Sequence, residues 1–199
     1  EIKNDTWNIW GKNIATEDSA DYDFTGAFDD ENFSPNIEAF LAEDQNAVKG
    51  NVFVCSGGGD KARENDYEGI PACEFYNSIG YNAYLVNYRV APYETIDATL
   101  DLQRAIRYVK HHGEEYGIGA LDKIATMGFS AGAMHCYAQA LSFAGNITPD
   151  KIYSDYICDE VDSENADITA AIAVYAAGMT HDENGNAVDV KEPVLKPES

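Results

Sequence analysis

Short apolar segments alternate with amphipathic ones from residue 50 onward, and this alternation constrains the fold more than any other feature of the chain. The apolar segments are NVFVCSGGG, NAYLVNYRV, KIATMGF and DITAAIAVYAAG. Each is apolar along nearly its whole length, which is typical of a strand buried on both faces. Such strands, alternating with helices, predict an α/β fold: a mostly parallel sheet with helices on both faces.

The segments between these strands carry the spacing and the end signals of helices. Helices are predicted over residues 72–79, 95–112 and 131–143. Pro71 suits the first turn of the first helix, and Gly113 stops the second. In open sheets of this kind, ligands bind outside the carboxyl ends of the strands. Two glycine-rich stretches lie at such ends, so we expect both to border a functional site.

The first 50 residues lack this alternation. They are polar and acidic, and we predict an irregular N-terminal segment with one or two short antiparallel strands, including a strand or turn over Pro35–Leu41. The chain has no internal repeat and no low-complexity linker. Residues 1–199 are therefore expected to form a single α/β domain.

Net charge limits the classes of partner. The chain carries 35 Asp and Glu against 13 Lys and Arg, for a net charge of −22. Such a chain is repelled by nucleic acid and by anionic lipid. It also contains no run of 18 apolar residues, so no membrane span is predicted.

The cysteines give no sign of a metal site. Cys55, Cys73, Cys136 and Cys158 form no C-x-x-C pair, and no histidine stands at zinc-ligand spacing. Free thiols favour a reducing compartment, the cytoplasm over secretion. Three N-x-S/T sequons point weakly the other way.

A G-x-S-x-G pattern spans Gly128 to Gly132, between the third predicted strand and the helix that follows. Small residues at such a junction can serve close packing alone. Alternatively, the pattern is a nucleophile elbow, in which a strained turn projects the Ser130 hydroxyl above the sheet. In an elbow, a side chain at either glycine would crowd the neighbouring strand or helix. The strand–helix context favours the elbow.

A second motif, Ser56-Gly57-Gly58-Gly59, follows the first buried strand. Its glycines let backbone N–H groups face an incoming oxyanion. A flexible turn or a phosphate loop are the alternatives. However, the Lys-Ser or Lys-Thr of a Walker A loop is absent, as is the G-x-G-x-x-G of a dinucleotide site. The two motifs in this order favour catalysis.

Over residues 50–178 the chain resembles an α/β-hydrolase esterase. It is most similar to acetylxylan-esterase and feruloyl-esterase-like carbohydrate esterases, and more distantly to hormone-sensitive-lipase-type enzymes. The matching motifs are C-P-G-G-G at Cys55–Gly59, E-G at Glu68-Gly69, Y-R-x-x-P at Tyr88–Pro92, D-x-x-R-A-I at Asp101–Ile106 and G-F-S-A-G at Gly128–Gly132.

The resemblance implies a serine esterase that deacylates acetylated or feruloylated carbohydrate, or a similar small ester, without metal or cofactor. Ser130 would be the nucleophile, and the N–H groups of Gly58, Gly59 and Ala131 would form the oxyanion hole. Two positions depart from the family pattern. Ser56 replaces its proline, and Asp60 replaces an aromatic residue after the glycines. The Asp60 carboxylate would either repel anionic substrates or point into solvent.

The base and the acid of a triad are not evident. In this superfamily the acid and then the histidine follow the nucleophile in the chain, and we expect both to lie beyond residue 199. His111 and His112 are expected to end a helix, and His135, five residues after Ser130, to be packed or on the surface. His181 follows the end of a strand and is a weak substitute for the base.

A chain that stops there would leave an apolar strand edge between Asp167 and Ala177. We expect a second polypeptide or another copy to cover that edge. Two rival functions stay open. One is a serine peptidase of the prolyl-oligopeptidase type, and the other is an inactive hydrolase scaffold that acts in binding.

Overall fold

The computed structural model describes residues 5–10, 33–142, 147–176, 179–181 and 187–189. Six strands form one sheet in the order β1-β2-β4-β3-β5-β6, and β7 and β8 form a separate antiparallel pair. The strands are β1 (Asp5–Asn8), β2 (Asn36–Phe40), β3 (Asn51–Cys55), β4 (Asn82–Asn87), β5 (Ile124–Phe129), β6 (Ala170–Val174), β7 (Met179–His181) and β8 (Ala187–Asp189).

The middle of the sheet is parallel. β3 pairs in parallel with β4 and β5, and β5 pairs in parallel with β6. The two strands from the N-terminal part of the chain, β1 and β2, extend the sheet antiparallel beyond β4. β3 and β4 are buried at every position, as their continuous apolar runs predict.

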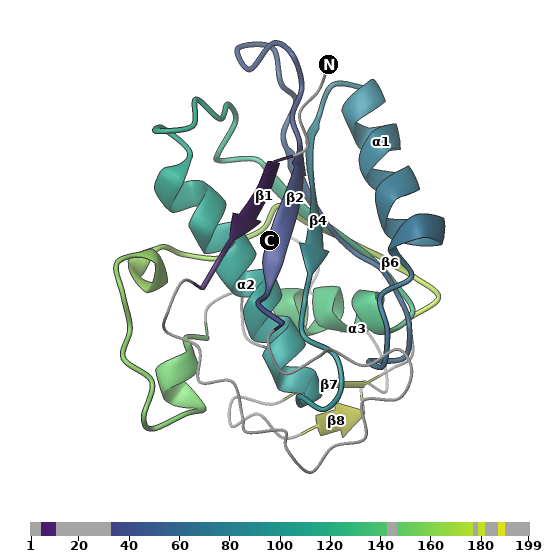
Figure 1. The fold of residues 1–199 in the computed structure, drawn as a ribbon, viewed down its shortest axis with the longest axis vertical. Helices are drawn as coiled ribbons and strands as arrows, with labels where there is room; N and C mark the ends of the chain where they lie inside the picture. Colours follow the sequence, from purple (N-terminus) through teal and green to yellow (C-terminus); the bar gives the residue numbers. More distant parts are fainter. Residues whose placement is uncertain (1–4, 11–32, 143–146, 177–178, 182–186, 190–199) are drawn as a thin grey trace, which may run out of the picture.

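Helices cover both faces of this sheet (Figure 1). They are α1 (Ile70–Ser78), α2 (Thr95–His112) and α3 (Ala131–Tyr137). Val52 and Val54 of β3 pack in one apolar cluster with Cys73 of α1. Phe53 and Cys55 point to the other face and pack in a second cluster with α2 and α3. Alternate residues of one strand thus serve two cores, which confirms the predicted fold class.

The helix ends differ from the prediction in two places. A π-helical turn, η1 (Asn65–Gly69), leads directly into α1, which begins at Ile70 rather than at residue 72. The third helix is α-helical only to Tyr137 and continues as a second π-helical turn, η2 (Ala138–Ser142). The prediction of one helix over 131–143 is wrong in this respect. The α2 bounds agree with the predicted 95–112.

β6 ends the sheet on one side within the described part of the chain. Its first three residues are exposed, and Ile172 keeps 40% of its surface accessible. The strand is shorter than the predicted segment, of which residues 177–178 lie outside the described residues. What covers this edge stays a prediction.

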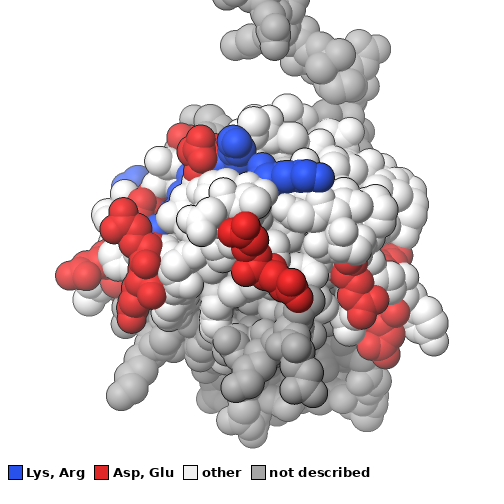
Figure 2. All heavy atoms as spheres, turned by 90° about the horizontal axis from the view of Figure 1, so that it is seen from above, with Lys and Arg blue, Asp and Glu red and all other residues white. Residues whose placement is uncertain are grey.

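Among the described helices, none is both long and apolar enough to span a bilayer. Acidic side chains form several separate groups on the face seen in Figure 2, around a few Lys and Arg.

Candidate active site

Ser130 occupies a strained turn between β5 and α3. Its backbone angles are φ 49° and ψ −115°, and it is the residue that caps the N-terminus of α3. A non-glycine residue with positive φ is uncommon and costs free energy, so the surrounding structure must hold it there. The Ser130 N–H donates to the Val174 carbonyl at the end of β6, 3.0 Å away. This is the backbone geometry that the elbow interpretation predicts.

The two outer glycines of the motif are in close contact with backbone. A Cβ at Gly128 would lie 2.3 Å from the Gly132 carbonyl oxygen. A Cβ at Gly132 would lie 2.2 Å from the Cys55 carbonyl oxygen and 2.5 Å from that of Ser56. Both positions therefore require glycine, as predicted from the crowding of strand and helix.

The loop Ser56–Gly59, hereafter the glycine loop, lies directly against the serine turn. A Cβ at Gly57 would be 3.0 Å from the Ser130 Cβ and 3.0 Å from the Phe129 carbonyl oxygen. Parallel pairing of β3 with β5, in register from Asn51 to Cys55, brings the two motifs together. The structure thus joins the two glycine-rich stretches at the carboxyl ends of adjacent strands.

Backbone donors of the glycine loop are available next to Ser130. Gly58 and Gly59 have φ of 137° and 66°, conformations that favour glycine. Within the described residues, neither N–H donates to a protein acceptor. Ala131 begins α3, and the first N–H groups of a helix have no intrahelical acceptor. The helix N-terminus also favours negative charge at this point. Together these groups can stabilise an oxyanion.

Asp60 does not simply point into solvent. Its Oδ1 lies 3.0 Å from Nε2 of His135, and its Oδ2 accepts a hydrogen bond of 3.2 Å from the Thr95 hydroxyl. His135 is fully buried, and its Nδ1 lies 3.4 Å from the Thr99 hydroxyl. Of the two expectations for His135, packed or on the surface, the first is confirmed. Asp60 and His135 together link the end of the glycine loop to α3.

Ser56, where the family pattern has proline, is buried and hydrogen-bonded. Its hydroxyl donates to Asn65 Oδ1 at 2.6 Å, and its carbonyl accepts a bond of 2.6 Å from the Tyr88 hydroxyl. Tyr88 begins the Y-R-x-x-P stretch, in which Arg89 forms a buried ion pair with Asp101 at 2.8 Å. The matched motifs are therefore in mutual contact around the loop.

The remaining histidines lie elsewhere. His111 and His112 are in the last turn of α2, near Glu164 (3.6 Å) and Glu115 (3.3 Å). The backbone of His181 is in β7, but its side chain lies outside the described residues, so its role as a base stays a prediction. Among the described side chains, none is hydrogen-bonded to the Ser130 hydroxyl.

Two residues at the site had no predicted role. Glu68 accepts hydrogen bonds from the Gly57 N–H at 2.6 Å and from the Tyr175 hydroxyl. The sequence marks Glu68-Gly69 only as part of a motif match, and the signal for Tyr175 is a polar hydroxyl near the end of the last apolar segment. A Cβ at Gly69 would lie 2.4 Å from the terminal methyl of Leu85, so that side chain would have to shift.

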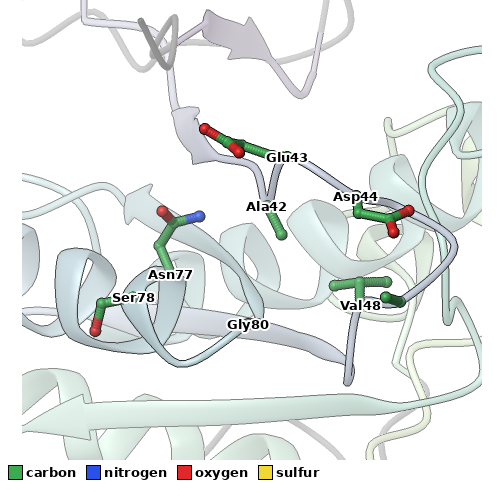
Figure 3. A pocket seen from close by; sticks show the side chains of 8 residues that line it. Ala42, Glu43, Asp44, Val48, Asn77, Ser78 and Gly80 are labelled. Carbon is green, nitrogen blue, oxygen red and sulfur yellow. The ribbon is translucent and has the colours of Figure 1, made fainter.

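The described residues show no metal-binding cluster at the serine turn, and the hollow beside the 42–48 loop lies away from it. No group of three or more metal-binding side chains occurs among the described residues. A hollow of about 340 Å³ is lined by the 42–48 loop and the end of α1 (Figure 3). It adjoins the amino ends of β3 and β4, whereas Ser130 lies at the carboxyl end of β5. The hollow is therefore separate from the serine site.

All four cysteines are free, and three of them, Cys55, Cys73 and Cys136, are buried. Burial raises the pKa of the Cys73 thiol. Cys158 is exposed, and its thiol donates to Asp150.

Similarity to known proteins agrees with this geometry. Residues 41–192 match the family model BD-FAE, whereas none of the curated proteins compared matches the chain. The acetyl ester-xyloside bifunctional hydrolase from Caldicellulosiruptor lactoaceticus is 25% identical, with a TM-score of 0.63 over 88% of this chain and 58% of that one.

A thermophilic esterase from the Planctomycetes species Thermogutta terrifontis, with butyrate bound, is 22% identical, with a TM-score of 0.58 over 73% of this chain and 50% of that one. The same esterase phosphorylated by paraoxon is also 22% identical, with a TM-score of 0.58 over 73% of this chain and 54% of that one. This chain thus spans between 50% and 58% of the length of these structures. The likeness confirms the α/β-hydrolase fold.

Proposed function

We propose that this chain, which belongs to the BD-FAE family, carries the nucleophile and the oxyanion hole of a serine hydrolase that cleaves carboxylic esters. The observation that carries the proposal is Ser130 itself, a non-glycine residue at φ 49° beside a loop whose Gly58 and Gly59 N–H groups have no acceptor among the described residues. Acylated saccharides or similar small esters are the substrates we infer, since the neighbours are described as an acetyl ester-xyloside hydrolase and as esterases.

In the proposed reaction, Ser130 Oγ attacks the acyl carbonyl carbon. The N–H groups of Gly58, Gly59 and Ala131 stabilise the tetrahedral oxyanion, which collapses to an acyl-enzyme as the alcohol leaves. Water then attacks the acyl-enzyme and releases the acid. The serine proton must pass to a base and from it to the leaving alcohol. We propose that a histidine and its acidic partner outside these 199 residues supply that base, in the chain order of the superfamily.

The nucleophile is tested with a fluorophosphonate probe on the full-length protein. Because the Thermogutta esterase is described as phosphorylated by paraoxon, we expect a phosphorus electrophile to modify Ser130 here. The Ser130→Ala variant should fold with an unchanged melting temperature, take up no probe and hydrolyse no p-nitrophenyl acetate. Modification at another residue, or hydrolysis that survives the substitution, would show that Ser130 is not the nucleophile.

One observation favours an inactive scaffold as the second candidate, namely that no described side chain is hydrogen-bonded to the Ser130 hydroxyl. Assays of the full-length protein against short p-nitrophenyl esters and peptide anilides separate the alternatives. Ester turnover supports the esterase, anilide turnover a peptidase, and inertness to both the scaffold.

A further inference from the structure

The Glu68 carboxylate joins the glycine loop to the end of β6. Its Oε2 accepts the Gly57 N–H at 2.6 Å, and its Oε1 accepts the Tyr175 hydroxyl. Glu68 belongs to η1, Gly57 follows β3, and Tyr175 follows β6. One side chain therefore connects three segments that meet around Ser130.

This contact divides the three glycines of the loop into two kinds. The Gly57 N–H is occupied by Glu68, and the Gly57 carbonyl accepts the Glu64 N–H at 2.9 Å. Both polar groups of Gly57 are thus held by the segment that leads into α1. The N–H groups of Gly58 and Gly59 are the ones left without an acceptor among the described residues.

Glu68 also lies close to the nucleophile. The position that a Cβ would take at Gly57 is 3.0 Å from Glu68 Oε2 and 3.0 Å from the Ser130 Cβ. A shift of Gly57 would therefore change the distance between the loop donors and the serine. Misplacement of such donors by about 1 Å can cost about 10²-fold in rate.

Tyr175 ties the other carboxylate oxygen to the backbone that anchors Ser130. It adopts φ 42° directly after Val174, whose carbonyl accepts the Ser130 N–H at 3.0 Å. The hydrogen bond to Glu68 raises the pKa of the Tyr175 hydroxyl. The hydroxyl therefore stays protonated and remains a donor at neutral pH. The serine turn and the glycine loop thus share one tether.

We propose that Glu68 is a positioning residue for acyl transfer, which holds Gly57 so that the N–H groups of Gly58 and Gly59 face the carbonyl attacked by Ser130. This inference rests on the proposed esterase function. Glu68 does not touch the reacting atoms in this role. It acts through the loop, and Tyr175 acts through Glu68.

The test compares four variants of the full-length protein: Glu68→Ala, Glu68→Gln, Tyr175→Phe and, as control, Glu74→Gln. Glutamine keeps a carbonyl acceptor for the Gly57 N–H and an amide group that can donate to the tyrosine oxygen. The control removes a charge from the exposed Glu74 in α1. Ester hydrolysis and the rate of fluorophosphonate labelling of Ser130 are measured well below each melting temperature.

We expect Glu68→Ala to lower kcat by about 10²-fold, the scale of a misplaced oxyanion donor, with KM changed less than threefold. The kcat of Glu68→Gln should be at least tenfold higher than that of Glu68→Ala. The rate of fluorophosphonate labelling should change in parallel with kcat in all variants. Tyr175→Phe should lower kcat about fivefold, as one arm of the tether remains. Glu74→Gln should match the wild type. If Glu68 had a purely structural role, its removal would lower the melting temperature without this large fall in kcat at a nearly constant KM.

The outcomes separate the two proposals. If the wild-type protein is neither labelled at Ser130 nor active on esters, the proposed function fails. If it is labelled and active, but Glu68→Ala keeps kcat within twofold, the positioning role is wrong. Should Glu68→Ala not fold, Tyr175→Phe decides, because unchanged kcat and labelling in that variant would overturn the tether.

Discussion

Replacing Gly132 by alanine should separate activity from stability at the serine turn. An alanine Cβ there would lie 2.2 Å from the Cys55 carbonyl oxygen and 2.5 Å from that of Ser56. Carbon and oxygen normally approach to about 3.3 Å, so α3 and the end of β3 must move apart by about 1 Å. This movement separates Ser130 from the glycine loop, because α3 follows the serine and the loop follows β3.

The expected magnitudes differ for the two properties. Overpacking costs about 1–3 kcal/mol of unfolding free energy, but alanine is favoured over glycine inside a helix by about 1 kcal/mol. The net loss of stability should therefore be small, about 0–2 kcal/mol. The rate should fall by about 10²-fold, since a 1 Å displacement of reacting groups costs that much.

Urea denaturation and kcat/KM for p-nitrophenyl acetate measure the two effects in the full-length protein. Gly117→Ala is the matched control. Gly117 has φ 68° and no heavy atom within 4 Å of its would-be Cβ, so alanine there costs about 1–2 kcal/mol of backbone strain without touching the site. It should lower stability and leave activity intact. A Gly132→Ala variant that keeps kcat/KM within twofold would refute the reasoning.

Two further predictions concern the core around the site. Asp60→Ala should destabilise the protein by about 1.5–3 kcal/mol in urea denaturation, because the buried His135 loses a hydrogen-bonding partner at Nε2. Asp60→Asn keeps an acceptor and should cost less. Equal losses of stability in both variants would contradict this account. Burial raises the pKa of the Cys73 thiol. Above about pH 8.5 the unfolded chain therefore releases a proton that the folded chain retains. The free energy of unfolding should fall by about 1.4 kcal/mol per pH unit because of this thiol. Cys73→Ala should reduce that slope, whereas an unchanged slope between pH 9 and 10.5 would show that Cys73 does not contribute.

Local sequence patterns were sufficient for the fold and for the placement of the two motifs. Continuous apolar runs identified the four parallel strands. For β3 and β4 the reason is burial at every position, because strands covered on both faces have no polar side. β6 was found by the same pattern although its first three residues are exposed. The bounds of α2 agreed with the prediction, because Gly113 stops a clear helical spacing. The end of the third helix was missed. Ala138–Ser142 consists mostly of residues that suit any helix, and propensity does not distinguish an α-helical from a π-helical turn.

The contacts around the site could not be read from local patterns. Asp60 and His135 are 75 residues apart, and Glu68 and Tyr175 are 107 apart. Each pair depends on where α3, η1 and β6 pack, which spacing along the chain does not encode. The sequence therefore predicted that both glycine-rich stretches lie at the carboxyl ends of strands, but not which side chains hold the glycine loop in place.

The two interpretations of G-x-S-x-G, close packing and a nucleophile elbow, require the same two glycines, so the glycines cannot decide between them. Ser130 can. A turn that served packing alone would place glycine at φ 49°, because an L-residue there is less favourable by about 1–2 kcal/mol. A serine in that position gains nothing from its side chain in packing terms, since it is only half-buried and its hydroxyl bonds to no described residue. The strain has a reason if the hydroxyl itself is needed where the turn puts it, beside the Gly58 and Gly59 N–H groups, which bond to no described acceptor. The serine's conformation, more than the motif, therefore supports the proposed nucleophile.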